Sequence, residues 1–134
     1  MTTDLRLLAC STVLTWLMLM LSALLRTRWW TWRGVILALG NRDDVPEPSA
    51  VAARADRAAK NMLENLVLFA ALLLGAHAAL VPPARLELAA ELFFWARLAY
   101  FPVYLAGIPY LRTALWAVAV VGLGLIAWAI FSAG

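Results

Sequence analysis

Three polar residues, Arg57, Asn61 and Glu64, introduce a long stretch of the chain that carries no charge. Their spacing of four and three residues places them on one face of an α-helix over two turns. The uncharged segment from Leu66 to Pro83 follows almost directly. A cation, an amide and an anion aligned at the mouth of a membrane helix predict a binding site for a small zwitterion.

A plainer interpretation of the same stretch stays open. Arg54, Arg57 and Lys60 are suited to anchoring a helix at the level of the lipid headgroups, with Arg57 and Glu64 paired within the helix. This accounts for the cations better than for Asn61 and Glu64, because a carboxylate that faces lipid is costly. Ionisable groups inside a span usually face protein or water and indicate a function.

A second polar face lies further along the chain, where Arg97, Tyr100 and Tyr104 are spaced by three and four residues. One interpretation is structural, with Arg97 paired to Glu64 or Glu91 of the bundle. The other makes this face the second wall of the same polar pocket, with the two phenols as hydrogen-bond donors. Antiparallel packing would bring the two faces to the same depth.

Arg112 stands in the first turn of the last apolar segment. A cation is slightly unfavourable at a helix N-terminus, so either membrane anchoring or a functional role keeps it there. The single histidine, His77, and the single cysteine, Cys10, are far apart, so we expect no metal site and no internal disulfide. The basic residues follow a membrane pattern, and we expect no nucleic-acid partner.

The elements that position these residues follow from composition. The chain has 134 residues, of which 65% are hydrophobic and 14% are charged, and it contains seven Trp. Soluble domains are usually about 45–50% apolar and about 25% charged, and tryptophan is enriched at membrane interfaces. We therefore expect an integral membrane protein with membrane lipids as partners and a single domain over residues 1–134.

Four spans are expected, with helices over approximately 3–25, 49–80, 84–106 and 109–132. Thr3 or Asp4 is expected to cap the first helix and Ser49 the second. The apolar segment 35–39 is too short to span and is expected either as an interfacial piece or as the tail of the first helix. Short second and third connections make neighbours antiparallel, so the predicted fold is an all-α membrane protein, a four-transmembrane-helix up-down bundle.

Basic residues are unevenly distributed between the two ends of this bundle. The connection after the first helix and the base of the second carry seven of them: Arg26, Arg28, Arg33, Arg42, Arg54, Arg57 and Lys60. The opposite end has only Arg6 and Arg85. The positive-inside rule then predicts a cytoplasmic arginine-rich end and both termini outside.

Three motifs together resemble the MAPEG family, the membrane-associated proteins in eicosanoid and glutathione metabolism. They are Arg57-Ala-x-x-Asn61-x-x-Glu64, Ala96-Arg97-x-x-Tyr100-x-x-x-Tyr104 and Pro109-Tyr-Leu-Arg112-Thr. The three motifs are spread over nearly the whole chain, and the family has the same order of four helices. The sequence is most similar to the bacterial branch of that family.

The resemblance implies a homotrimer that binds glutathione as cosubstrate between subunits. By this likeness the glutathione-binding residues are Arg54, Arg57, Asn61, Glu64, Arg97, Tyr100 and Tyr104. Arg112 resembles the arginine that activates the thiol in a catalytic member. The implied activity is that of a glutathione transferase or peroxidase acting on lipophilic small molecules from the bilayer. The alternative is a non-enzymatic membrane lipid-binding or scaffold protein on the same fold.

Overall fold

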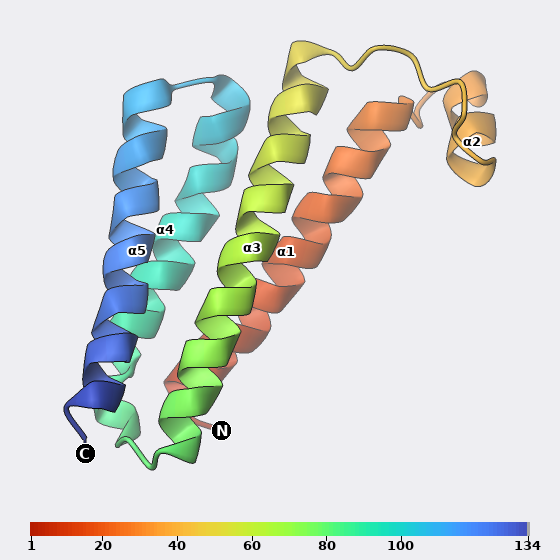
Figure 1. Cartoon of the computed structure of the whole chain (residues 1–134). Coiled ribbons are helices and arrows are strands. Elements are labelled where there is room, and N and C mark those ends of the chain that lie inside the picture. Colours follow the sequence, from red (N-terminus) through yellow and green to blue (C-terminus); the bar gives the residue numbers. More distant parts are fainter. Residues whose placement is uncertain (134) are drawn as a thin grey trace.

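The computed structural model describes residues 1–133, and within them the chain is helical with no strand. Its helices are α1 (Thr3–Thr27), α2 (Trp32–Leu39), α3 (Ala50–Ala78), α4 (Glu87–Ala106) and α5 (Pro109–Phe131), with a 3₁₀ turn at Pro83–Arg85. The four long helices are each long and apolar enough to cross a membrane. Figure 1 shows them as an up-down bundle, which confirms the predicted fold class.

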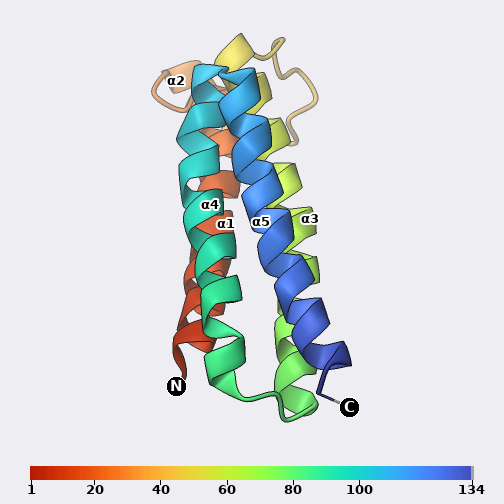
Figure 2. The same ribbon diagram turned by 90° about the vertical axis from the view of Figure 1, so that its left-hand side faces the viewer.

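The four long helices lie side by side, and consecutive ones run in opposite directions (Figures 1 and 2). α1 packs mainly against α3, and α4 packs mainly against α5. Both termini lie at one end of the bundle. The opposite end, which we call the arginine-rich end, holds α2, the start of α3 and the turn between α4 and α5.

Local signals set the helix ends. The Ser49 hydroxyl accepts a hydrogen bond from the Ala52 amide at 3.2 Å, so the predicted cap of α3 is confirmed. The predicted side-chain cap of α1 is wrong, because its first turn has no side-chain cap bond and the Asp4 carboxylate turns to His77 instead. α4 begins three residues later than expected, because Pro83 to Arg85 first form a separate 3₁₀ turn.

Small residues and aromatic rings let the helices approach closely. A Cβ atom added to Gly122 of α5 would lie 2.7 Å from the carbonyl oxygen of Ala89, so a side chain there would push α4 away. The Phe69 and Phe93 rings stack across α3 and α4 with centroids 4.1 Å apart. These contacts bring α3, α4 and α5 together on the side of the bundle that carries the polar side chains.

The face of α1 that points into the bundle is polar. Asp4, Ser11, Thr15 and Ser22 are all buried there. At the end that holds the termini, the Asp4 Oδ2 atom lies 2.5 Å from Nε2 of His77 on α3. This contact ties the first helix to the end of α3, and it uses a histidine for which the sequence offered no partner.

Candidate functional site

Arg97 is the largest fully buried side chain of the described residues, with 0% of its surface exposed. Its Nη1 atom donates a hydrogen bond to the Asn61 Oδ1 atom of α3 at 2.8 Å. Its Nε and Nη2 atoms have no partner in the described chain. The guanidinium carbon lies 5.7 Å from the Phe93 ring centroid and 5.1 Å from that of Tyr100. The Arg97 guanidinium therefore has two buried donors that no described residue satisfies.

A pocket of about 280 Å³ lies between α4 and α5, and Arg97 reaches it only through its contact with Tyr100. It is lined by Tyr100, Tyr104, Arg112, Thr113 and Trp116. The Arg112 guanidinium carbon lies 4.7 Å from the ring centroid of Tyr104, and the two tyrosine rings meet edge to face at 5.4 Å. A series of contacts therefore links Asn61 of α3 to Arg112 of α5. The residues between them are Arg97, Tyr100 and Tyr104 of α4.

Arg54 occupies a separate, structural position at the arginine-rich end. Its Nε atom donates to the backbone carbonyl of Leu105 at 2.9 Å, so α3 is fastened to the last turn of α4. The guanidinium lies beside Gly107, whose φ of +76° ends α4 in the left-handed conformation. Arg54 and Asn61 thus join the same two helices at two levels.

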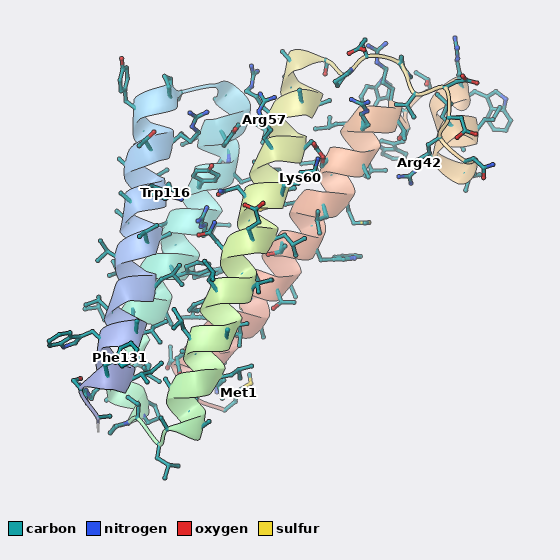
Figure 3. The ribbon with its side chains drawn as sticks, in the orientation of Figure 1. Met1, Arg42, Arg57, Lys60, Trp116 and Phe131 are labelled. Atoms are coloured by element: carbon teal, nitrogen blue, oxygen red, sulfur yellow. The ribbon has the colours of Figure 1, made fainter. Side chains whose placement is uncertain are left out.

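Arg57 and Glu64 are exposed, and neither forms an ion pair among residues 1–133. The ion pair in this stretch joins Lys60 to Asp56 at 2.9 Å, on the surface. Figure 3 shows Arg57 and Lys60 near the start of α3. The structural pairing of Arg57 with Glu64 is therefore wrong for the single chain. Glu64 is exposed and has no ion-pair partner within residues 1–133.

The alternative pairing of Arg97 with Glu64 or Glu91 is wrong as well. Both carboxylates are exposed, and the atom that Arg97 contacts is the amide oxygen of Asn61. The Asn61 amide accepts a hydrogen bond from one Arg97 nitrogen but does not neutralise the positive charge. The guanidinium therefore has no anionic partner within the described residues. Contacts through Tyr100 and Tyr104 connect this guanidinium with Arg112, which lines the pocket.

Two features of the site were not anticipated from the sequence. Thr113, directly after Arg112, and Trp116, one turn after it, line the pocket, and Figure 3 shows Trp116 on α5. Asn65 is buried, and its Nδ2 atom donates to the Asn61 carbonyl at 2.8 Å. The spacing of four residues between the two asparagines was the signal available for this contact.

Fold and site together define a class: a four-helix transmembrane bundle with a cationic pocket near one membrane face. Compared with known protein families, the chain matches the MAPEG family over residues 7–132. The match covers nearly all of its 134 residues, so the chain belongs to the MAPEG family. No curated protein and no solved structure matches the sequence.

Proposed function

We propose that this protein binds glutathione at the pocket between α4 and α5 and at the adjoining polar residues of α3, and that it conjugates glutathione through its sulfur to lipophilic electrophiles or uses it to reduce lipophilic hydroperoxides. The observation that carries the proposal is the buried Arg97, which has two unpaired donors and lies against Tyr100, a residue that lines a pocket with a second arginine. Membership of the MAPEG family supports the choice of a glutathione-type ligand. The chain's residues supply complementary groups for each charged end of that tripeptide.

The charges divide between the two ends of the ligand. Glutathione carries two carboxylates, one ammonium and a thiol. Arg97 offers its two unpaired nitrogens to one carboxylate, and a guanidinium binds a carboxylate through two parallel bonds. Arg57 is exposed at the start of α3, and we assign it to the other carboxylate. Glu64 is exposed as well, and we assign it to the ammonium.

Arg112 is assigned to the thiol. A free thiol has a pKa of about 8.5, and a nearby guanidinium lowers it, which raises the thiolate fraction at neutral pH. In the transferase reaction the thiolate forms a carbon–sulfur bond as the leaving group departs with the electron pair. In the peroxidase reaction the hydroperoxide is reduced to an alcohol, and two glutathiones are oxidised to the disulfide. Tyr104 holds the Arg112 guanidinium over its ring.

The enzyme assay uses the purified protein in detergent with glutathione and either a chlorodinitrobenzene or an organic hydroperoxide. We expect a thiolate absorbance when glutathione is added, followed by conjugation or reduction. Binding without thiolate absorbance and without turnover of either compound would contradict the enzymatic assignment. That outcome would favour the non-enzymatic lipid-binding or scaffold protein instead.

Glu64→Gln removes one charge and keeps the side-chain shape. We expect glutathione affinity to fall by roughly 1.5–3 kcal/mol, about ten- to a hundredfold, because a charge-assisted hydrogen bond to the ammonium is lost. We expect the melting temperature to stay unchanged, because Glu64 is exposed and has no ion-pair partner in residues 1–133. Unchanged affinity with a large drop in melting temperature would refute this role. Calorimetry and thermal unfolding on the one variant give both numbers.

We propose a homotrimer, with a neighbouring copy closing the pocket. Ligand sites usually measure about 300–1,000 Å³, so the pocket of about 280 Å³ in one chain is small for a tripeptide. The exposed Arg57 and Glu64 leave part of the polar face uncovered. Native mass spectrometry from detergent should give three copies as the main species, and a main species of one copy would count against the proposal.

We also propose that the arginine-rich end faces the cytoplasm and that both termini face outside in a bacterial inner membrane. The basis is the uneven distribution of Arg and Lys between the two ends. Cysteines are introduced separately at Asp44 and Ala133, with the native Cys10 replaced by Ser. An impermeant maleimide should reach the cysteine at position 133 from outside intact cells and the cysteine at position 44 only from the cytoplasmic side. Reaction of both positions from the same side would contradict the four-span topology.

A further inference from the structure

A second surface of the molecule carries cations and exposed tryptophans outside the glutathione pocket. We call it the arginine–tryptophan corner, and it comprises Arg26, Arg28, Trp29, Trp30, Trp32 and Arg33 at the junction of α1 and α2. The indole rings of Trp29, Trp30 and Trp32 are 51%, 61% and 79% exposed. Figure 1 shows α2 beside the end of α1 and away from α4 and α5, so this surface stands apart from the pocket.

The corner is a defined structure. Arg28 adopts the left-handed conformation with φ 53° and ends α1. The Thr31 hydroxyl donates to the Arg28 carbonyl at 2.9 Å and accepts from the Gly34 amide at 3.0 Å, which caps α2. A Cβ atom on Gly34 would lie 2.1 Å from the Arg28 carbonyl oxygen and 2.4 Å from that of Thr27. Only glycine fits there, so α2 is pressed directly onto the end of α1.

α2 presents an apolar stripe to its surroundings. Trp32, Ile36 and Leu39 are spaced by four and three residues on one face, and they are 79%, 56% and 85% exposed. Eight residues extend only about 12 Å at 1.5 Å per residue, so α2 is too short to span. An exposed apolar stripe beside tryptophans and arginines is typical of a helix that lies in the membrane interface.

A hollow of about 380 Å³ opens at the same corner, and Arg28, Thr31 and Arg33 are among the residues that line it. Neither arginine forms an ion pair within residues 1–133. Pro46 of the following connection also lines the hollow, but the neighbouring acidic residues Asp43, Asp44 and Glu47 are not among its lining residues. Two guanidinium groups around one hollow suit a phosphate group.

We propose that the arginine–tryptophan corner binds the headgroup of an anionic phospholipid. Arg28 and Arg33 hold the phosphate, and the apolar stripe of α2 rests in the interface beside the acyl chains. The exposed tryptophans and the apolar stripe favour a lipid over an acidic protein or a soluble phosphate, because neither of these would bury them. This binding is independent of the glutathione pocket.

The test is native mass spectrometry of the full chain released from mixed micelles of phosphatidylcholine and phosphatidylglycerol. We expect the wild type to retain phosphatidylglycerol preferentially. The double variant Arg28→Gln/Arg33→Gln should retain it about 30-fold less, since each basic residue near an anionic surface contributes roughly fivefold. The matched control Arg6→Gln/Arg85→Gln removes the same charge from the opposite end and should behave like the wild type. Equal losses in both variants, or no preference in the wild type, would overturn the proposal.

Two further measurements separate the possible sources of the phosphate and the possible causes of a loss. Inorganic phosphate added in excess should leave the bound phosphatidylglycerol in place, and its displacement would assign the hollow to a soluble anion. A fluorophore on Ile36→Cys, with Cys10→Ser, should be quenched by brominated phosphatidylglycerol in vesicles, whereas absence of quenching would refute the interfacial position of α2. Glutathione affinity and melting temperature of Arg28→Gln/Arg33→Gln should match the wild type, and misfolding of that variant leaves the quenching result to decide.

Discussion

Arg97→Met should abolish measurable glutathione binding without lowering the melting temperature of the ligand-free protein. Arg97 is fully buried and makes one hydrogen bond, to Asn61, while two of its nitrogens have no partner in the described chain. In our proposal those nitrogens bind a carboxylate. Losing two charge-assisted bonds of roughly 1.5–3 kcal/mol each weakens binding by at least about 100-fold.

Arg97→Met should weaken glutathione binding but should not lower the stability of the ligand-free protein. An unpaired buried charge carries a desolvation cost of several kcal/mol, and an apolar side chain of similar length removes it. The loss of the Asn61 bond, which is worth roughly 1.5–3 kcal/mol because its donor is charged, offsets only part of that gain. Calorimetric titration and thermal unfolding give the two quantities, with the exposed Arg26→Met as the matched control. A variant that binds normally, or one that unfolds at a much lower temperature, would make Arg97 a structural residue.

Arg112→Gln should lower the rate of glutathione conjugation about 100-fold while changing glutathione affinity only a few-fold. Arg112 lines the pocket with its guanidinium over the Tyr104 ring, and in our proposal it stabilises the thiolate. Removing one preorganised donor for a reacting anion typically costs 10²- to 10³-fold in rate. The binding groups for the carboxylates and the ammonium stay in place, so the effect falls on turnover.

The pH dependence separates this role from simple anchoring. Without the guanidinium the thiol returns toward its ordinary pKa of about 8.5. The rate of the variant should then rise about tenfold per pH unit between pH 6 and 8 and approach the wild type in more alkaline buffer. Thr113→Val changes a neighbouring residue of the same pocket and should keep the wild-type profile. A variant with the wild-type rate and profile would reduce Arg112 to a membrane anchor.

Much of the fold could be predicted because a membrane imposes strong rules on sequence. Uncharged stretches, the Ser49 cap and the turn at Gly107 placed the four spans correctly. The short helix α2 was anticipated only as an interfacial segment or as the tail of the first helix, because the close contact of Gly34 with the carbonyls of α1 is a tertiary feature. The link between Asp4 and His77 joins residues 73 positions apart, and spacing along one helix does not reveal such a contact.

The sequence predicted which residues belong to the candidate site better than it predicted the contacts between them. Helical spacing grouped Asn61 with Arg57 and Glu64, and Arg97 with the two tyrosines. It did not reveal that an amide, rather than a carboxylate, contacts Arg97. That choice depends on how α3 and α4 are rotated against each other, and the packing of Phe69 on Phe93 and the bond from Arg54 to Leu105 fix this rotation. The same packing brings α5 close enough for Trp116 to line the pocket.

Isothermal titration of glutathione into the purified protein in detergent micelles tests the central claim most directly. We predict saturable binding, at no more than one ligand per chain, that an analogue without the two carboxylates does not reproduce. Loss of the signal in Arg97→Met and its retention in Arg26→Met would place the ligand at the buried arginine. Absence of saturable binding by the folded wild-type protein would contradict the assignment of this pocket to glutathione.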